Sequence, residues 1–308
     1  MTKKKKEKIS IITTFYNASE FVIKAVSSVL CQHIDKDRFC VEYILVDDCS
    51  TDDSYEKVMK FIDGCATIDC HLIQPENNLG CGGARRYGIE HATGDYFMFL
   101  DADDYYINDT FIMSAYSDIT VNDADIVEYG IVFNQANGSS TVNAVSRRIV
   151  IDENPRLAML ALFRDNYIKF NVWTKIYRRY VVESYTYSDE RMFEDVRTIP
   201  VWITKAKRIV IMPTVEINYR ASQSSIIRTD FRATRLGTIS AIASHFETWK
   251  NDPEVLRAMY GRAMIDLEAM LNNNSSENDG FNEMSLLNTK MLQYIYPDSW
   301  KDKVFQIE

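Results

Sequence analysis

Apolar runs and segments of helical periodicity alternate along the first hundred residues. Apolar runs predict four strands, at residues 9–14, 41–47, 70–74 and 95–100, of which 9–14 is rich in β-branched residues and 41–47 is expected to be buried. Apolar positions spaced three and four apart predict the intervening helices, at residues 17–31, 52–62 and 82–92. Ser50 and Thr51 are the N-cap candidates of the second helix. Fully apolar strands that alternate with helices indicate an α/β fold, a mainly parallel sheet covered on both faces.

The pattern loosens after residue 107 but still predicts regular elements. Helices are expected at residues 111–119 and 154–163, and strands at 124–133, at 147–152 and as a pair within 208–220. From about residue 229 the sequence becomes mostly helical, with amphipathic stretches over 230–271 and 283–294 separated by a polar loop. We therefore expect a C-terminal helical appendage on the α/β domain.

Composition and charge narrow the range of partners. The chain has 308 residues, 46% of them hydrophobic, and a net charge of -9, which disfavours general nucleic-acid binding because phosphates require a basic surface. No apolar stretch approaches the roughly 20 residues that cross a bilayer, so we expect a cytoplasmic protein. The lysine run at residues 3–6 is the exception to the acidic balance. It reads as a solvated tail or as a peripheral contact with the anionic inner face of the membrane.

Six cysteines occur without a CxxC pair. In the absence of a secretion signal they are expected to be reduced and mostly buried thiols, and a metal site built from them is disfavoured.

Polar loops follow each of the first four predicted strands. They cover residues 13–17, 47–54, 77–85 and 101–104. Because ligands of open parallel sheets bind beyond the carboxyl ends of the strands, these loops should converge on one crevice.

The acidic loop at residues 101–104 reads Asp-Ala-Asp-Asp and is the strongest candidate for chemistry. Carboxylates at i and i+2, Asp101 and Asp103, can face the same way from an extended segment, and Mg²⁺ and Mn²⁺ prefer oxygen ligands. The plain alternative is a solvated acidic turn before the next helix. After the second strand, Asp48 is placed to accept a hydrogen bond from a nucleobase N–H.

The glycine-rich loop at residues 77–85 raises the question of whether the protein is a dinucleotide-binding or a P-loop protein. Its Gly80, Gly82 and Gly83 suggest a dinucleotide fingerprint, but Arg85 stands where the third glycine belongs, and the loop follows the third strand rather than the first. A Rossmann dehydrogenase is therefore disfavoured, and no GxxxxGK[ST] sequence supports a P-loop enzyme. A glycine turn followed by Arg85 would suit a diphosphate.

Several motifs in one order resemble a known family. "ISIITTFYNASEF", "EYILVDDCSTDDS", "NNLGCGGARRYGIEHATGDYFMFLDADD", "NVWTKIYRR" and "ERMFEDVRTIP" together resemble the family 2 glycosyltransferases of the GT-A fold over residues 8–226. The resemblance divides the chain into a catalytic domain, residues 1–226, and a helical region, residues 227–308.

The resemblance implies an inverting transfer from a nucleotide-diphosphate sugar, with UDP favoured, to a hydroxyl of a saccharide or lipid-linked acceptor in surface-glycan synthesis. It implies Mn²⁺ or Mg²⁺ as cofactor. The nucleotide-sugar site would comprise Thr14, Tyr16, Asp48, Arg85, Asp101 and Ala102. Asp103 would bind the metal with Asp101, and Asp195 would be the catalytic base supported by Glu194. Arg86 stands where the family usually has asparagine, and its role stays open.

The acceptor site is less defined. Trp173, Lys175 and the aromatic-rich stretch at residues 180–193 would suit a sugar, although core or surface packing explains them equally well. Two other classes remain as alternatives. A sugar nucleotidyltransferase would need a glycine-rich loop after the first strand, where this sequence has none, and the intact acidic motifs speak against a non-catalytic binding or scaffold protein. Assembly into a homo-oligomer is left open.

Overall fold

The computed structural model describes residues 6–65, 67–134, 140–184, 187–188, 193–220 and 231–272. For residues 231–236 and 266–272 only the backbone is considered. Lys3–Lys5, the boundary expected at residue 226 and the helix expected at 283–294 lie outside the described residues.

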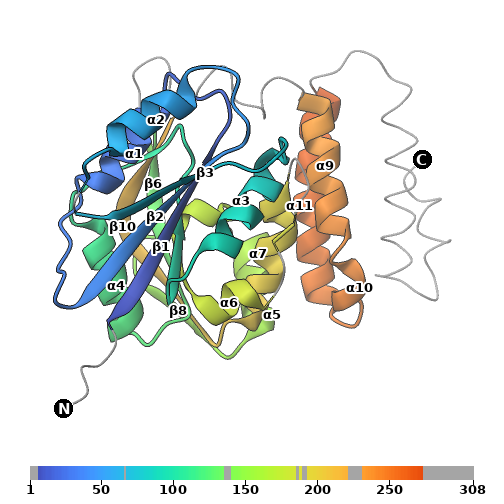
Figure 1. The fold of residues 1–308 in the computed structure, drawn as a ribbon. Coiled ribbons are helices and arrows are strands. Elements are labelled where there is room, and N and C mark those ends of the chain that lie inside the picture. The colour runs from blue at the N-terminus through green and yellow to red at the C-terminus, as the bar shows by residue number, and fades with distance from the viewer. Residues whose placement is uncertain are drawn as a thin grey trace.

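A central sheet runs in the order β3-β2-β1-β4-β9-β6-β10-β5 (Figure 1). The four strands predicted first form its parallel half, namely β1 (Glu7–Phe15), β2 (Phe39–Asp47), β3 (Asp69–Ile73) and β4 (Tyr96–Phe99). Their side chains are almost entirely buried in β1, β2 and β4, as continuous apolar runs require. The carboxyl ends of these strands lie at one edge of the sheet, where the four polar loops begin.

The second half of the sheet is mixed. It contains β5 (Tyr105–Tyr106), β6 (Ile126–Asn134), β7 (Ser140–Asn143), β8 (Ile149–Asp152), β9 (Lys175–Arg178) and β10 (Arg208–Arg220). β9 is antiparallel to both β4 and β6. The expected pair of strands within 208–220 is wrong, because this segment is one strand, β10, whose register with β6 shifts on either side of Val215. Pro213 has no N–H to donate to the ladder, and here it accompanies an irregularity in one strand rather than a turn between two.

Helices cover both faces of the sheet (Figure 1). One face carries α1 (Val22–Leu30), α2 (Ser54–Ile62) and α4 (Phe111–Val121), and the other carries α3 (Gly80–His91), α5 (Pro155–Phe163), α6 (Arg179–Glu183) and α7 (Glu194–Lys205). A short 3₁₀ turn, η1 (Val172–Thr174), precedes β9. Asn154 caps α5 by accepting from the Leu157 N–H, with Pro155 in the first turn as expected.

The C-terminal helices α9 (Phe231–Ala243), α10 (Phe246–Trp249) and α11 (Pro253–Asn272) form a further layer beside α5 and α7 (Figure 1). Arg156 of α5 forms ion pairs with Asp252 and Glu254, and the Val196 carbonyl of α7 lies 3.3 Å from Nε2 of His245. These contacts join the helical region to the α/β domain. None of the helices within the described residues is long and apolar enough to cross a membrane.

Two expectations about small features are wrong. Ser50 and Thr51 do not cap α2, which begins at Ser54; instead, Ser50 Oγ accepts from the Asn17 N–H, and the Thr51 N–H donates to Asn17 Oδ1. These bonds tie the loop after β1 to the loop after β2. The cysteines are free thiols, but Cys31 is exposed and the other five are only partly buried.

Candidate active site

The loops after the first three strands meet at Asp48. The Asp48 N–H donates to the Phe15 carbonyl at 2.8 Å, which joins the end of β1 to the end of β2. Asp48 Oδ1 accepts from the Leu79 N–H at 2.7 Å and Oδ2 from the Gly80 N–H at 2.8 Å. The convergence expected from the parallel sheet is therefore present in detail.

Asp48 was expected to hold a nucleobase, and the structure gives it a structural task as well. The residue is only 3% exposed and its carboxylate holds the first residues of α3, where backbone N–H groups lack helical partners. Gly80 adopts φ +75°, which an L side chain rarely adopts, so glycine is required at this turn. Each carboxylate oxygen can accept a second hydrogen bond, so contact with a base N–H stays compatible with this geometry.

Arg85 lies at the centre of the site. Its guanidinium donates to Asp101 Oδ1 at 2.5 Å, to Glu194 Oε1, and to the Tyr187 hydroxyl at 3.2 Å. The partner Glu194 is 109 positions away in sequence, so one buried side chain of α3 joins the acidic loop after β4 to the start of α7. From the sequence, Arg85 was expected to bind a diphosphate, whereas in this structure its guanidinium binds two carboxylates.

Glu194 and Asp195 form the first turn of α7, as the sequence predicted. Asp195 Oδ1 accepts from the Val196 N–H at 2.7 Å. Burial and the neighbouring Glu194 charge raise the pKa of Asp195 to about 7, while Arg85 acts in the opposite direction. A carboxyl that titrates near neutral pH is suited to accept a proton from a hydroxyl.

The acidic loop presents three carboxylates of unequal availability. The Asp101 carboxylate is held by Arg85, and Asp104 Oδ1 accepts from the Arg220 N–H at 3.0 Å. Asp103 makes no side-chain hydrogen bond or ion pair with another described residue. Burial and the Asp101 charge raise the pKa of Asp103 to about 6. Ala102, between Asp101 and Asp103, is buried.

This donor set fits a hard divalent cation. Asp104 Oδ2 is buried and has no hydrogen-bond partner among the described residues, and the clustered carboxylates repel one another until a positive charge binds. Within the described residues, no three His, Cys, Asp or Glu side chains are grouped closely enough to hold a metal ion by themselves. Mg²⁺ sites commonly use only one or two carboxylates and complete the shell with water and substrate phosphates, so the residues present fit such an ion.

Thr14 and Tyr16 lie at the end of β1, beside these loops. Thr14 pairs with Val46 of β2 and is partly exposed, and the Tyr16 side chain is 50% exposed. An aromatic ring at the open edge is available to contact a nucleobase.

Lys175 is not at an acceptor surface. It is 1% exposed, and its ammonium donates to the carbonyls of Lys169 and Asn171 at 2.7 Å and to Thr174 Oγ1 at 2.9 Å. Trp173 is also buried and stacks on Tyr219, with ring centroids 5.7 Å apart. Lys175 is therefore not available to contact an acceptor, and Trp173 is a packing residue in this structure.

Two contacts of the predicted residues were not found from the sequence. Tyr187, in the aromatic-rich stretch expected near the acceptor, contacts Arg85 instead, and Glu128 of β6, outside the Arg85 cluster, lies 3.5 Å from the Lys175 ammonium. The signal for Glu128 was a single carboxylate in an otherwise apolar strand, which in a buried strand requires a cation nearby.

Comparisons with known proteins agree with this architecture. The family model "Glycosyl transferase family 2" matches residues 10–185, more than half of the chain. The glycosyltransferase GlyG of Streptococcus pneumoniae is 27% identical over 235 residues, which cover 73% of this chain and 74% of that protein.

Solved structures show the same fold. Residues 1–349 of Staphylococcus aureus TarS in complex with UDP-GlcNAc match with a TM-score of 0.69 and 18% identity, over 94% of this chain and 81% of that one. The mannosyltransferase PcManGT of Pyrobaculum calidifontis, in complex with GDP-Man and Mn²⁺, matches with a TM-score of 0.58 and 16% identity, over 96% and 83%. These likenesses confirm the GT-A fold that the motifs implied.

Proposed function

Because the chain belongs to glycosyltransferase family 2, we propose that it transfers a sugar, with inversion, from a UDP-sugar to a hydroxyl of a saccharide or lipid-linked acceptor. TarS, which has the same fold over almost the whole of this chain, binds UDP-GlcNAc, and this supports UDP as the nucleotide. Surface-glycan synthesis is the proposed setting.

A single observation carries the catalytic assignment. Arg85 binds Asp101 and Glu194 at once, and this holds the acidic loop and the start of α7 next to each other. Inverting transfer requires a base on one side of the anomeric carbon and stabilisation of the leaving diphosphate on the other. The Arg85 bridge supports the placing of both groups in one site.

Asp195 is the proposed base. It accepts the proton of the acceptor hydroxyl as that oxygen attacks the anomeric carbon, and the diphosphate leaves on the opposite face. One displacement inverts the carbon, so no covalent intermediate with the enzyme is needed. Glu194 positions Asp195 through its own ion pair with Arg85, and its charge keeps the pKa of Asp195 high.

Asp103, with Asp101, would hold the divalent cation. Such a cation, when bound, supplies a Lewis acid that stabilises the charge on the leaving diphosphate. Asp48 fixes the loop that begins α3, and Tyr16 and Thr14 border the proposed nucleotide site.

The decisive experiment identifies the nucleotide product that the enzyme releases from the donor. The purified chain is incubated with a panel of UDP-sugars, saccharide acceptors and Mn²⁺, and UDP release is followed. We expect release of UDP that requires an acceptor and that fails in Asp195→Asn. In a parallel incubation with UTP and a sugar 1-phosphate, release of pyrophosphate would instead identify a nucleotidyltransferase. Donor binding without turnover across the panel would contradict a catalytic role.

A further inference from the structure

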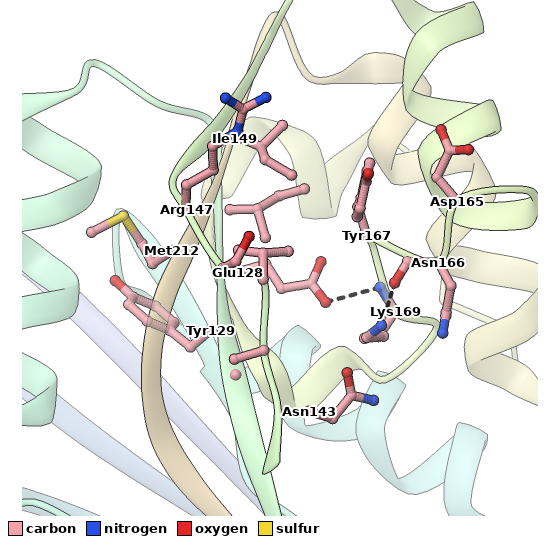
Figure 2. A pocket seen from close by; sticks show the side chains of 15 residues that line it. Glu128, Tyr129, Asn143, Arg147, Ile149, Asp165, Asn166, Tyr167, Lys169 and Met212 are labelled. Atoms are coloured by element: carbon pink, nitrogen blue, oxygen red, sulfur yellow. Dashed lines mark hydrogen bonds between the residues drawn. The ribbon is translucent and has the colours of Figure 1, made fainter.

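A cavity lies outside the Arg85 cluster. It has a volume of about 520 Å³ and lies between β6, the connection from β7 to β8, the segment after α5, and β10 (Figure 2). Within the described residues its lining includes none of the candidate active-site side chains. Its polar side chains include Glu128, Asn143, Ser146, Arg147, Asp165, Asn166 and Lys169. Its size lies in the range of roughly 300–1,000 Å³ of small-molecule sites.

Glu128 is a buried carboxylate in the wall of this cavity. It is 1% exposed, and Oε1 accepts from the Lys169 N–H at 2.8 Å (Figure 2). Oε2 has no hydrogen-bond partner, an arrangement that buried polar atoms rarely keep without a ligand or water. This wall therefore offers an acceptor that nothing in the described chain satisfies.

The charges of the cavity do not cancel. Glu128 lies beside the Lys175 ammonium, and Asp165 forms an ion pair with Arg164 at 2.8 Å. By contrast, Arg147 forms no ion pair with any residue that the structure describes. Lys169, whose ammonium donates to the Asn166 carbonyl, shares the charge of Glu128 with Lys175. Among the described residues three cations thus depend on the charge of Glu128, and this excess of positive charge favours an anionic ligand.

The rest of the lining suits a ligand rich in hydroxyl groups. The amides of Asn143 and Asn166 can both donate and accept, and Glu128 Oε2 accepts. Tyr167 is 45% exposed at the cavity and presents an aromatic ring that a sugar can pack against (Figure 2). A cavity that can bind an anion, several hydroxyl groups and the face of a sugar ring fits an acidic saccharide.

The cavity is lined by none of the residues proposed for catalysis. Within the described residues its lining contains neither Asp195 nor Glu194, and the buried Lys175, whose ammonium lies 3.5 Å from Glu128, does not reach it either. A ligand in the cavity would therefore be a more distant part of the acceptor rather than the reacting sugar.

We propose that this cavity binds a carboxylate or phosphate group carried by the acceptor saccharide, at a position remote from the reacting hydroxyl. Arg147 and Lys169 bind the anion, and Asn143, Asn166 and Glu128 bind neighbouring hydroxyls. The inference rests on the proposed function, because it deepens the identity of the acceptor.

Three small probes test the site without turnover. Glucuronate, glucose 6-phosphate and glucose are compared by saturation-transfer NMR and calorimetry on the full chain. We expect the acidic sugars to bind and neutral glucose to bind at least tenfold more weakly, with affinity falling as salt is added. Binding of glucuronate alone identifies a carboxylate-bearing acceptor, and binding of glucose 6-phosphate alone identifies a phosphate-bearing one.

Variants locate the probe. Arg147→Gln and Lys169→Gln should each weaken the acidic probes about tenfold and leave UDP affinity unchanged. Arg148→Gln is the matched control, since Arg148 is adjacent and exposed but bonds Asn122 outside the cavity. The proposal is overturned if neither acidic sugar binds, if glucose binds equally well, or if Arg148→Gln has the same effect. UDP release by the same preparations reports separately on the proposed function.

Discussion

Removing the Arg85 guanidinium should reveal how tightly the two acidic motifs depend on one cation. The chosen substitution is Arg85→Met, which keeps an unbranched apolar stem and removes the charge and the hydrogen bonds of the guanidinium. In the native protein this guanidinium bonds Asp101, Glu194 and Tyr187, and both Arg85 and Glu194 are buried. The variant therefore leaves Glu194 as a buried carboxylate without its cation.

The expected loss of stability follows from that uncompensated charge. Removing one partner of a buried ion pair typically costs about 3–5 kcal/mol, because the remaining charge stays desolvated. Asp101 contributes less, since its side chain is 28% exposed and water can replace part of the lost interaction. A loss of about 3–5 kcal/mol is a large fraction of the roughly 5–15 kcal/mol that stabilises a typical domain.

Denaturation by urea, followed by far-UV circular dichroism, measures this loss. Arg85→Met is compared with Glu194→Gln and with the double variant Arg85→Met/Glu194→Gln. The double variant should recover part of the stability lost in Arg85→Met, because it buries no unpaired charge. Activity should not recover, since neither motif is then held by the bridge.

The pH dependence of any residual activity in Arg85→Met gives an independent test of the role of Arg85. Arg85 lowers the pKa of Asp195, so its removal should move the acid limb of the pH–rate profile to higher pH. A base must be deprotonated to act, so the variant needs a higher pH for the same fraction of active enzyme. A stability loss below about 1 kcal/mol, with an unshifted acid limb, would refute the central role of Arg85.

Three further predictions concern single groups. Asp103→Asn should lower turnover roughly a hundredfold or more, and EDTA should have a similar effect on the native enzyme; near-normal rates in both assays would exclude the metal assignment. Asp195→Asn should lower transfer about a hundredfold to ten-thousandfold while retaining UDP-sugar binding by calorimetry. Because the folded-state pKa of Asp195 is raised to about 7, native stability should fall as pH rises from about 4 to 7, and Asp195→Asn should be the more stable protein at pH 8. Lys175→Met should destabilise the fold by about 3 kcal/mol through the stranded Glu128, and adding Glu128→Gln should restore part of it; a single variant as stable as the native chain would contradict this pairing.

The first half of the fold follows from local patterns. Continuous apolar runs predicted β1, β2 and β4, whose residues are almost all buried because these strands are covered on both faces. The edge strand β3 was also predicted, although its residues are partly exposed, and the parallel-sheet rule brought the four loops to one edge. The Asn17, Asp48 and Gly80 contacts are the physical form of that convergence. Prediction was accurate here because periodicity and loop position are both properties of short segments.

Partners distant in sequence could not be predicted in the same way. Arg85 and Glu194 are 109 positions apart, and nothing in either local segment identifies the other. Lys175 illustrates the opposite error, since its aromatic surroundings suggested a surface contact. Its partner Glu128 lies directly opposite it in the β6–β9 register, and that register depends on the whole sheet. In β10, Pro213 could equally have marked a turn or an irregular strand, and only the pairing with β6 distinguishes them.

The unequal engagement of the acidic loop gives its three carboxylates different tasks. Arg85 holds Asp101, so this side chain links the loop to α7 and retains only part of its charge for a cation. Asp104 is buried and receives the Arg220 N–H, which fixes the loop to the end of β10. Asp103 alone is held by neither contact, and burial and the Asp101 charge raise its pKa more than Arg220 and Arg85 lower it. A cation would gain most from a carboxylate that makes no hydrogen bond or ion pair with the other described residues, and for this reason we propose metal binding first for Asp103.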